Sequence, residues 1–150
     1  MPAFHPEDPD FEARVTSSFQ QQKFMETIGA ALTRVAPGEV EIELPFQDSL
    51  TQQHGYMHGG VVTAIADSAC GYAALSLFPT GAEVLTVEYK VNFLAPATGP
   101  RLVARGRVIR RGRTISVCAS DVVAVGDSIE TPVAMMMATM VRSDKKVRAG

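Results

Sequence analysis

The sequence predicts an α+β domain in which one curved antiparallel sheet wraps around a single central helix. The segment from His58 to Phe78 is apolar almost all round, and a helix without a polar face must be enclosed by other elements. Its many small side chains let a sheet approach closely. The segments after it alternate apolar and polar residues, as half-buried strands do. An α/β sandwich is the second choice, because the chain lacks the repeated strand–helix units of a parallel sheet.

The elements are expected in the order helix, strand, long helix and four strands. Residues 17–35 are predicted to form the first helix, in which Phe24, Ile28 and Leu32 share one face. Residues 39–46 alternate cleanly and predict a half-buried strand. A polar loop then leads into the central helix. The later strands are expected at residues 83–94, 102–110, 114–125 and 131–141.

The strand at residues 83–94 has the longest alternating pattern. Its apolar side chains are expected on one face, and these are Leu85, Val87, Tyr89, Val91 and Phe93. Thr86 is expected on the opposite face, because successive side chains of a strand point to opposite sides.

Length and composition favour one domain of ordinary size. Of the 150 residues, 1–16 are predicted to be a flexible N-terminal arm, 17–142 the folded domain, and 143–150 a polar tail. The net charge of -2 argues against general nucleic-acid binding. No apolar run is long enough for a membrane span, and no secretory signal pattern begins the chain, so a cytoplasmic protein is predicted. Cys70 and Cys118 lack metal or redox spacing and are expected to be reduced core residues.

Asp67 is the residue that first suggests a function. It is the only Asp, Glu, Lys or Arg between Ser49 and Ala82, and an apolar helix disfavours its charged form. The sequence His58-Gly59-Gly60 opens this helix, where free backbone N–H groups and the positive end of the dipole are available to a ligand. A carboxylate combined with amide donors is typical of a site that hydrolyses an acyl group.

The stretch GYMHGGVVTAIADSA, at residues 55–69, resembles the hotdog-fold thioesterases, specifically the phenylacetate-pathway (PaaI-type) acyl-CoA thioesterases. The later TVEYKVNFLAPA and the order of elements extend the resemblance over about residues 40–141. It implies a hotdog fold and hydrolysis of acyl-CoA thioesters to a free acid and CoA, with aryl-acyl or short-to-medium acyl groups preferred and no cofactor. It also implies a homodimer with sites at its interface, paired again into a tetramer.

The resemblance assigns roles to five residues. Asp67 is expected to act as a general base or as the nucleophile, and the Gly59 N–H to bind the thioester carbonyl. Thr86 is expected to position water. Gln52 stands where many relatives carry an asparagine, and His58 has at most a supporting role beside the glycine turn. In the implied dimer, Gln52 and Gly59 come from one subunit and Asp67 and Thr86 from its partner.

Other side chains are expected to contact the substrate. Arg111 and Arg113 lie in a predicted hairpin, where they suit the phosphates of CoA. A solvated turn that protects a sheet edge is the alternative for these arginines. Tyr56, Met57 and Gly60 are expected to line the acyl pocket. Gln53 is a possible substitute for Gln52.

No metal site is predicted. His54 and His58 with Asp67 lack the helical spacing and the further ligand that a metal would need. Two other functions stay open. A hotdog dehydratase or hydratase would pair a loop histidine with a helix carboxylate in an HFPG-type context, which the sequence lacks. A non-catalytic acyl-CoA sensor would use the same pocket but would not need Asp67.

Overall fold

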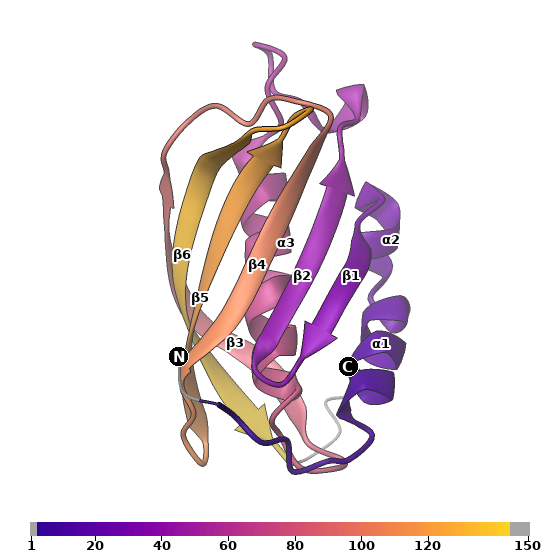
Figure 1. Ribbon diagram of the computed structural model, residues 1–150, viewed down its shortest axis with the longest axis vertical. Helices are drawn as coiled ribbons and strands as arrows, with labels where there is room; N and C mark the ends of the chain where they lie inside the picture. The colour runs from indigo at the N-terminus through magenta and orange to yellow at the C-terminus, as the bar shows by residue number, and fades with distance from the viewer. Residues whose placement is uncertain (1–2, 145–150) are drawn as a thin grey trace.

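The computed structural model describes residues 3–144, so most of the predicted tail lies outside the described residues. A six-stranded sheet with the strand order β1-β2-β4-β5-β6-β3 wraps around the helix α3 (Figure 1). All five strand pairs are antiparallel. The helical elements are α1 (Phe11–Gln21), α2 (Lys23–Ile28), the 3-10 turn η1 (Asp48–Leu50) and α3 (Gly59–Leu75). The strands are β1 (Ala31–Ala36), β2 (Glu39–Pro45), β3 (Glu83–Phe93), β4 (Arg101–Arg110), β5 (Ile115–Val125) and β6 (Glu130–Ser143).

The central helix is enclosed as predicted. Ile65, Ala66 and Ala69 are fully buried between α3 and the sheet. The closest approach is at Gly106 on β4, where an added Cβ would overlap the backbone of Ala69. Small residues on both elements therefore allow the sheet to lie directly against the helix, and the predicted α+β architecture is confirmed.

The strand predicted at residues 39–46 is also confirmed. Every second side chain of β2 is fully buried against the core, namely Val40, Ile42 and Leu44. The glutamates between them lie on the outer face of the sheet, where Glu43 forms an ion pair with Arg101 of β4 at 3.0 Å. The alternating pattern thus identified both faces of this strand correctly.

The helix predicted over residues 17–35 is wrong at both ends. Two helices, α1 and α2, occupy the first part of the segment, and β1 occupies the last part. Gly29 ends α2 in the left-handed conformation, with a φ of 76°, which glycine adopts without strain. Beyond it Leu32 pairs with Ile42 of β2. The helical spacing of Leu32 from Ile28 was therefore accidental.

The helix α1 begins within the segment expected to be a flexible arm. Val15 is fully buried. The Arg14 guanidinium donates to the backbone carbonyls of Leu75, Phe78 and Pro79, at 2.8, 2.7 and 2.5 Å. These carbonyls lie at the C-terminal end of α3, where helices leave acceptors unpaired and favour a positive charge. Residues of the expected arm thus stabilise the end of the central helix.

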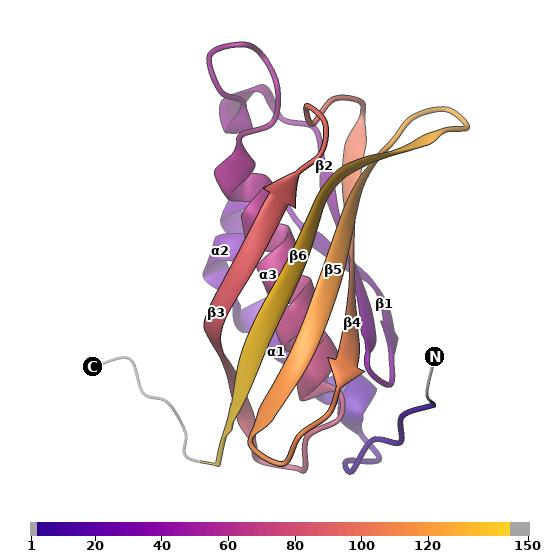
Figure 2. The same ribbon diagram turned by 90° about the vertical axis from the view of Figure 1, so that its left-hand side faces the viewer.

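The strand β3 forms one edge of the sheet, beside β6 (Figure 2). A β-bulge between Thr86 and Glu88 interrupts its alternation. Thr86 and the later Tyr89 are both opposite buried residues of β6, so both face α3. Leu85 faces the other side of the sheet. The prediction that all five apolar residues share one face is therefore wrong, because the bulge at Val87 moves the later ones to the face that Thr86 occupies.

Both cysteines are core residues, as predicted. Cys70 on α3 and Cys118 on β5 are buried and free. Burial raises the pKa of both thiols, that of Cys118 to about 12. Because the thiolate is the reactive form of cysteine, both thiols are chemically protected. Among residues 3–144 no helix is long and apolar enough to cross a membrane.

Candidate active site

Asp67 and Thr86 meet where α3 lies against the edge strand β3. The Thr86 hydroxyl donates to Oδ1 of Asp67 at 2.8 Å. Burial raises the pKa of the Asp67 carboxyl, and the hydrogen bond from Thr86 offsets part of that rise. A carboxylate with a raised pKa is a stronger base than a solvated one, and a general base works best with a pKa near the operating pH. Thr86 therefore places a hydroxyl donor on a carboxylate suited to proton transfer.

The Asp67 carboxylate opens into a cavity of about 530 Å³ between α2, α3 and β3. This size is typical of pockets that hold small organic groups. The cavity is lined mainly by apolar or small side chains, including Phe24, Met25, Ala64 and Val91. A smaller hollow of about 160 Å³ lies along α3 on the C-terminal side of Asp67. Asp67 and Thr86 both line it.

His58 caps the N-terminus of α3. Its Nδ1 accepts a hydrogen bond from the Gly60 N–H at 2.7 Å, so the ring proton of the neutral histidine lies on Nε2. Gly59 is the first residue of the helix, so no helical carbonyl lies one turn before it to accept from its N–H. His58 thus accepts the Gly60 N–H, and the Gly59 N–H is left for a ligand. This is the supporting role expected for His58.

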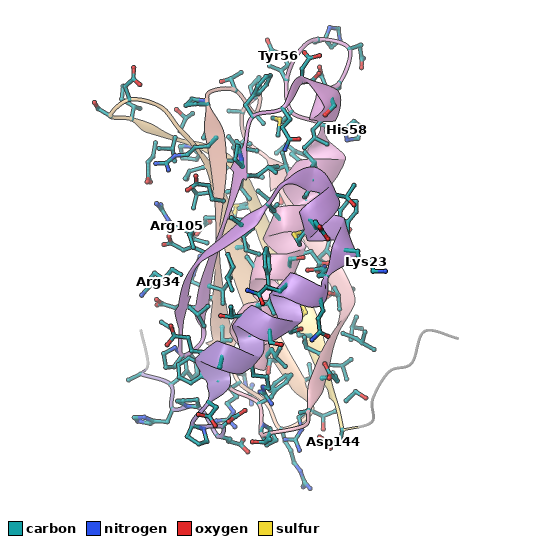
Figure 3. The ribbon with its side chains drawn as sticks, turned by 90° about the vertical axis from the view of Figure 1, so that its right-hand side faces the viewer. Lys23, Arg34, Tyr56, His58, Arg105 and Asp144 are labelled. Carbon is teal, nitrogen blue, oxygen red and sulfur yellow. The ribbon has the colours of Figure 1, made fainter. Side chains whose placement is uncertain are left out.

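A second cavity, of about 420 Å³, lies beside Gly59. Gln52, Tyr56 and Met57 line it, so the structure brings these predicted residues together. The Gln52 Oε1 accepts from the backbone N–H groups of His54 and Tyr56, at 2.6 and 3.3 Å. Among the described residues no acceptor is found for the amide nitrogen of Gln52, so this donor is available to a ligand. The loop that carries Tyr56 and His58 lies at one end of the molecule (Figure 3).

The two halves of the predicted site are separate within one chain. Gly59 and Asp67 are eight residues apart on α3, which corresponds to about 12 Å along a helix. Their cavities share no lining residue, although Gly60, the neighbour of Gly59, lines the Asp67 cavity. A single thioester carbonyl needs its hydrogen-bond donor about 3 Å away, with the base or nucleophile close by. One chain therefore holds an Asp67–Thr86 half and a Gly59–Gln52 half, which do not meet.

Residues 54–130 match the thioesterase superfamily model. The chain belongs to the thioesterase superfamily. A thioesterase family protein from Silicibacter pomeroyi is 45% identical, with a TM-score of 0.86 over 88% of this chain and 97% of that one. The 1,4-dihydroxy-2-naphthoyl-CoA hydrolase of Listeria monocytogenes is 28% identical over 61% of this chain and 75% of its own length. The E. coli PaaI protein shares the fold, with a TM-score of 0.79 at 17% identity over 91% of this chain and 96% of that one.

These comparisons confirm the hotdog fold and identify the protein as a thioester hydrolase. The resemblance inferred from the HGG turn and Asp67 is thereby confirmed at the level of the family.

The predicted CoA-binding arginines lie far from the Gly59 turn of this thioesterase. They belong to the β4–β5 hairpin, at the end of the sheet opposite the loop between β2 and α3 (Figures 1 and 2). Arg111 forms an ion pair with Glu7 and donates to the His5 carbonyl at 3.4 Å. Its guanidinium therefore holds the N-terminal segment against the hairpin. Arg113 is exposed.

Sequence reasoning missed the contribution of the joint between α1 and α2 to the thioesterase site. Gln22 and Phe24 line the Asp67 cavity, and Figure 3 looks onto α1 and α2 where they lie across α3. The sequence placed both residues inside one long helix. The extended backbone of Gln22 interrupts that helix, and no proline or glycine marks the break.

No metal centre is visible in the part of the chain that the structure describes. Within residues 3–144, no three side chains of His, Cys, Asp or Glu gather as metal ligands. The Nε2 atom of His54 instead lies 3.4 Å from the amide nitrogen of Gln53. Both side chains are exposed.

Proposed function

We propose that this thioesterase hydrolyses acyl-CoA thioesters to a free carboxylic acid and CoA, at sites shared between the two subunits of a homodimer. The observation that carries the proposal is the half-buried Asp67 carboxylate, bonded to Thr86 beside a cavity of about 530 Å³. The name of the related CoA hydrolase from Listeria monocytogenes supports CoA as the thiol carrier. The preference for aryl-acyl or short-to-medium acyl groups follows from the resemblance to the PaaI-type enzymes, and a cavity of this size can hold such groups.

In the proposed reaction, an oxygen nucleophile adds to the thioester carbonyl carbon and the C–S bond breaks. Asp67 either removes a proton from the attacking water or attacks the carbonyl carbon itself, forming an acyl-enzyme anhydride that water then hydrolyses. The released sulfur takes up a proton as CoA thiol. Thr86 orients the carboxylate through its hydrogen bond. Negative charge on the carbonyl oxygen is stabilised by the Gly59 N–H, a type of donor that typically contributes about 3 kcal/mol.

The separation of the two half-sites supports a shared site. Because Gly59 and Asp67 of one chain lie about 12 Å apart along α3, a second chain must supply one of them. The edge strand β3 offers a means of pairing, since its outer edge has no partner strand in the described chain. Tyr89 and Phe93 on this strand are 45% and 55% exposed. Unpaired apolar edges of this kind favour pairing with another strand.

A two-fold axis between antiparallel β3 strands would reverse the partner's α3, so that its Gly59 end approaches Asp67 of the first chain. The resulting dimer would have two equivalent sites. Half-exposed apolar side chains on the outer face of the sheet, such as Met135 and Met137, support the further pairing of dimers into a tetramer. Contact of Arg111 and Arg113 with CoA and a cytoplasmic location stay predictions.

The direct test is release of thiol by the purified protein with aryl-acyl-CoAs and with short, medium and long straight-chain acyl-CoAs. Asp67→Asn preserves the shape of the side chain but removes the base, so turnover should fall by about 10²–10⁴-fold. Asp127→Asn, in the exposed β5–β6 turn, is the matched control and should keep full activity. Hydrolysis by Asp67→Asn at the wild-type rate would refute the assignment.

Two other outcomes would replace the proposal. A change in enoyl absorbance without thiol release would indicate a dehydratase or hydratase. Tight binding of acyl-CoA without turnover by the wild type would indicate a sensor.

A further inference from the structure

The joint between α1 and α2 contributes a polar side chain to the cavity that holds Asp67. Gln22 is partly buried there. Its Nε2 donates to the Ser68 hydroxyl at 3.3 Å, and its Oε1 accepts from the Tyr72 hydroxyl at 3.3 Å. Gln22 also lines the smaller hollow on the other side of Asp67. Its amide therefore stands between the two hollows that adjoin the candidate catalytic carboxylate.

The hydrogen bonds of Gln22 leave one donor available. A carboxamide nitrogen carries two N–H groups, and among the described residues Ser68 is the acceptor found for it. Ser68 and Tyr72 are 9% and 8% exposed. The Ser68 hydroxyl lies within hydrogen-bond distance of both the nitrogen and the oxygen of the amide, at 3.3 and 3.5 Å. The Tyr72 hydroxyl donates to the oxygen, and the second N–H is thus available to a group in the cavity.

Apolar side chains form part of the cavity wall beside this donor, which also includes Thr63, Asp67 and Tyr89. Phe24 and Met25 of α2 and Val91 of β3 form much of the cavity wall. A hydrocarbon chain that fills the cavity would cover the free N–H without giving it an acceptor, which is unfavourable. An acyl group with an oxygen at this point would pair with it. A site built to bond a substrate oxygen discriminates against the analogue that lacks it.

We propose that Gln22 selects acyl groups that carry a hydroxyl or keto oxygen within a few carbons of the thioester. This inference rests on the proposed acyl-CoA hydrolysis. The oxygen must be close to the reacting carbonyl, because Gln22 bonds to Ser68, the neighbour of Asp67, and lines both hollows beside that carboxylate. Gln22 lies outside residues 54–130, the part that matches the superfamily model.

The test compares kcat/KM for two pairs of thioesters that differ by one hydroxyl. The near pair is 3-hydroxybutanoyl-CoA and butanoyl-CoA, and the remote pair is 12-hydroxydodecanoyl-CoA and dodecanoyl-CoA. The wild type should prefer the hydroxylated member of the near pair. In Gln22→Met, which keeps the length of the side chain, that preference should fall about five- to tenfold. The preference within the remote pair should stay as in the wild type, because that hydroxyl lies beyond the reach of the Gln22 amide.

Gln21→Met is the matched control, because Gln21 is exposed and bonds to Ser17 on the same helix. It should keep the wild-type preference. An unchanged preference in Gln22→Met, or an equal loss for both members of the near pair, would overturn the inference. Absence of hydrolysis of all four thioesters by the wild type would overturn the proposed function as well.

A second variant covers the case in which Gln22→Met does not fold. Tyr72→Phe removes the hydroxyl that holds the Gln22 oxygen but keeps the ring that packs on Phe19, with centroids 5.8 Å apart. It should also lower the preference for 3-hydroxybutanoyl-CoA over butanoyl-CoA. Retention of the full preference in Tyr72→Phe would overturn the inference, because the Tyr72 hydroxyl helps to hold the Gln22 amide beside the cavity.

Discussion

Two opposing effects act on the pKa of the Asp67 carboxyl. Partial burial on α3 raises the pKa of the carboxyl, whereas the hydrogen bond from Thr86 lowers it. The balance sets the strength of the base, because the deprotonated carboxylate is the form that acts in either proposed mechanism. At the residue scale, Thr86 therefore tunes Asp67 as well as orienting it.

Thr86→Val should shift the acidic limb of the pH–activity profile to higher pH. The valine has the same shape but cannot donate, so the raised pKa of Asp67 rises further and activity is lost earlier as the pH falls. Activity at neutral pH should drop about tenfold, the usual effect of losing one hydrogen bond to a charged group. Thr131→Val, at an exposed position of β6, should leave the profile unchanged. A shift to lower pH in Thr86→Val would contradict the assigned direction.

The contact between α3 and β4 shows how the size of one side chain sets the distance between a helix and a sheet. Gly106 lets the sheet touch the backbone of α3 at Ala69. This contact fixes the depth of α3 in the sheet. It thereby fixes where Asp67 meets β3, on the other side of the helix. Close packing transmits even small displacements, so the site depends on a glycine that takes no part in the chemistry.

Gly106→Ala should destabilise the fold by about 1–3 kcal/mol or more, because overpacking forces the backbone apart. Denaturant-induced unfolding measures the change. Gly126→Ala is the control, since an added Cβ there would make only ordinary contact, 3.8 Å from the Ile129 carbonyl. Equal stability of Gly106→Ala and the wild type would mean that helix and sheet are less tightly packed than described.

The sequence was sufficient to predict the elements that have a regular pattern of apolar and polar residues. Alternation identified β2, and the isolated carboxylate after the HGG turn identified Asp67. It was insufficient where a β-bulge or a break in a helix interrupts that pattern. The bulge at Val87 reverses the alternation of β3, and residues that suit a helix equally well conceal the break at Gln22. Both irregularities lack a local signal such as proline, and both lie beside the site.

In the proposed dimer, one active site needs two chains. Asp67→Asn removes the carboxylate half. Gly59→Pro removes the other half, because proline has no N–H. Proline suits the first position of a helix, and the extended conformation of His58 is the one that a following proline requires. The ring of Phe93, 3.1 Å from an added Cβ, must move by only a few tenths of an ångström.

The measurement that tests this claim most directly is the activity of the two variants after they have been unfolded and refolded together. Each variant alone should be nearly inactive. In a mixed dimer, Gly59 of the Asp67→Asn chain and Asp67 of the Gly59→Pro chain form one intact site. Random assembly of two-fold dimers should then restore about a quarter of the wild-type activity. No recovery from a mixture shown to contain mixed dimers would contradict the shared site.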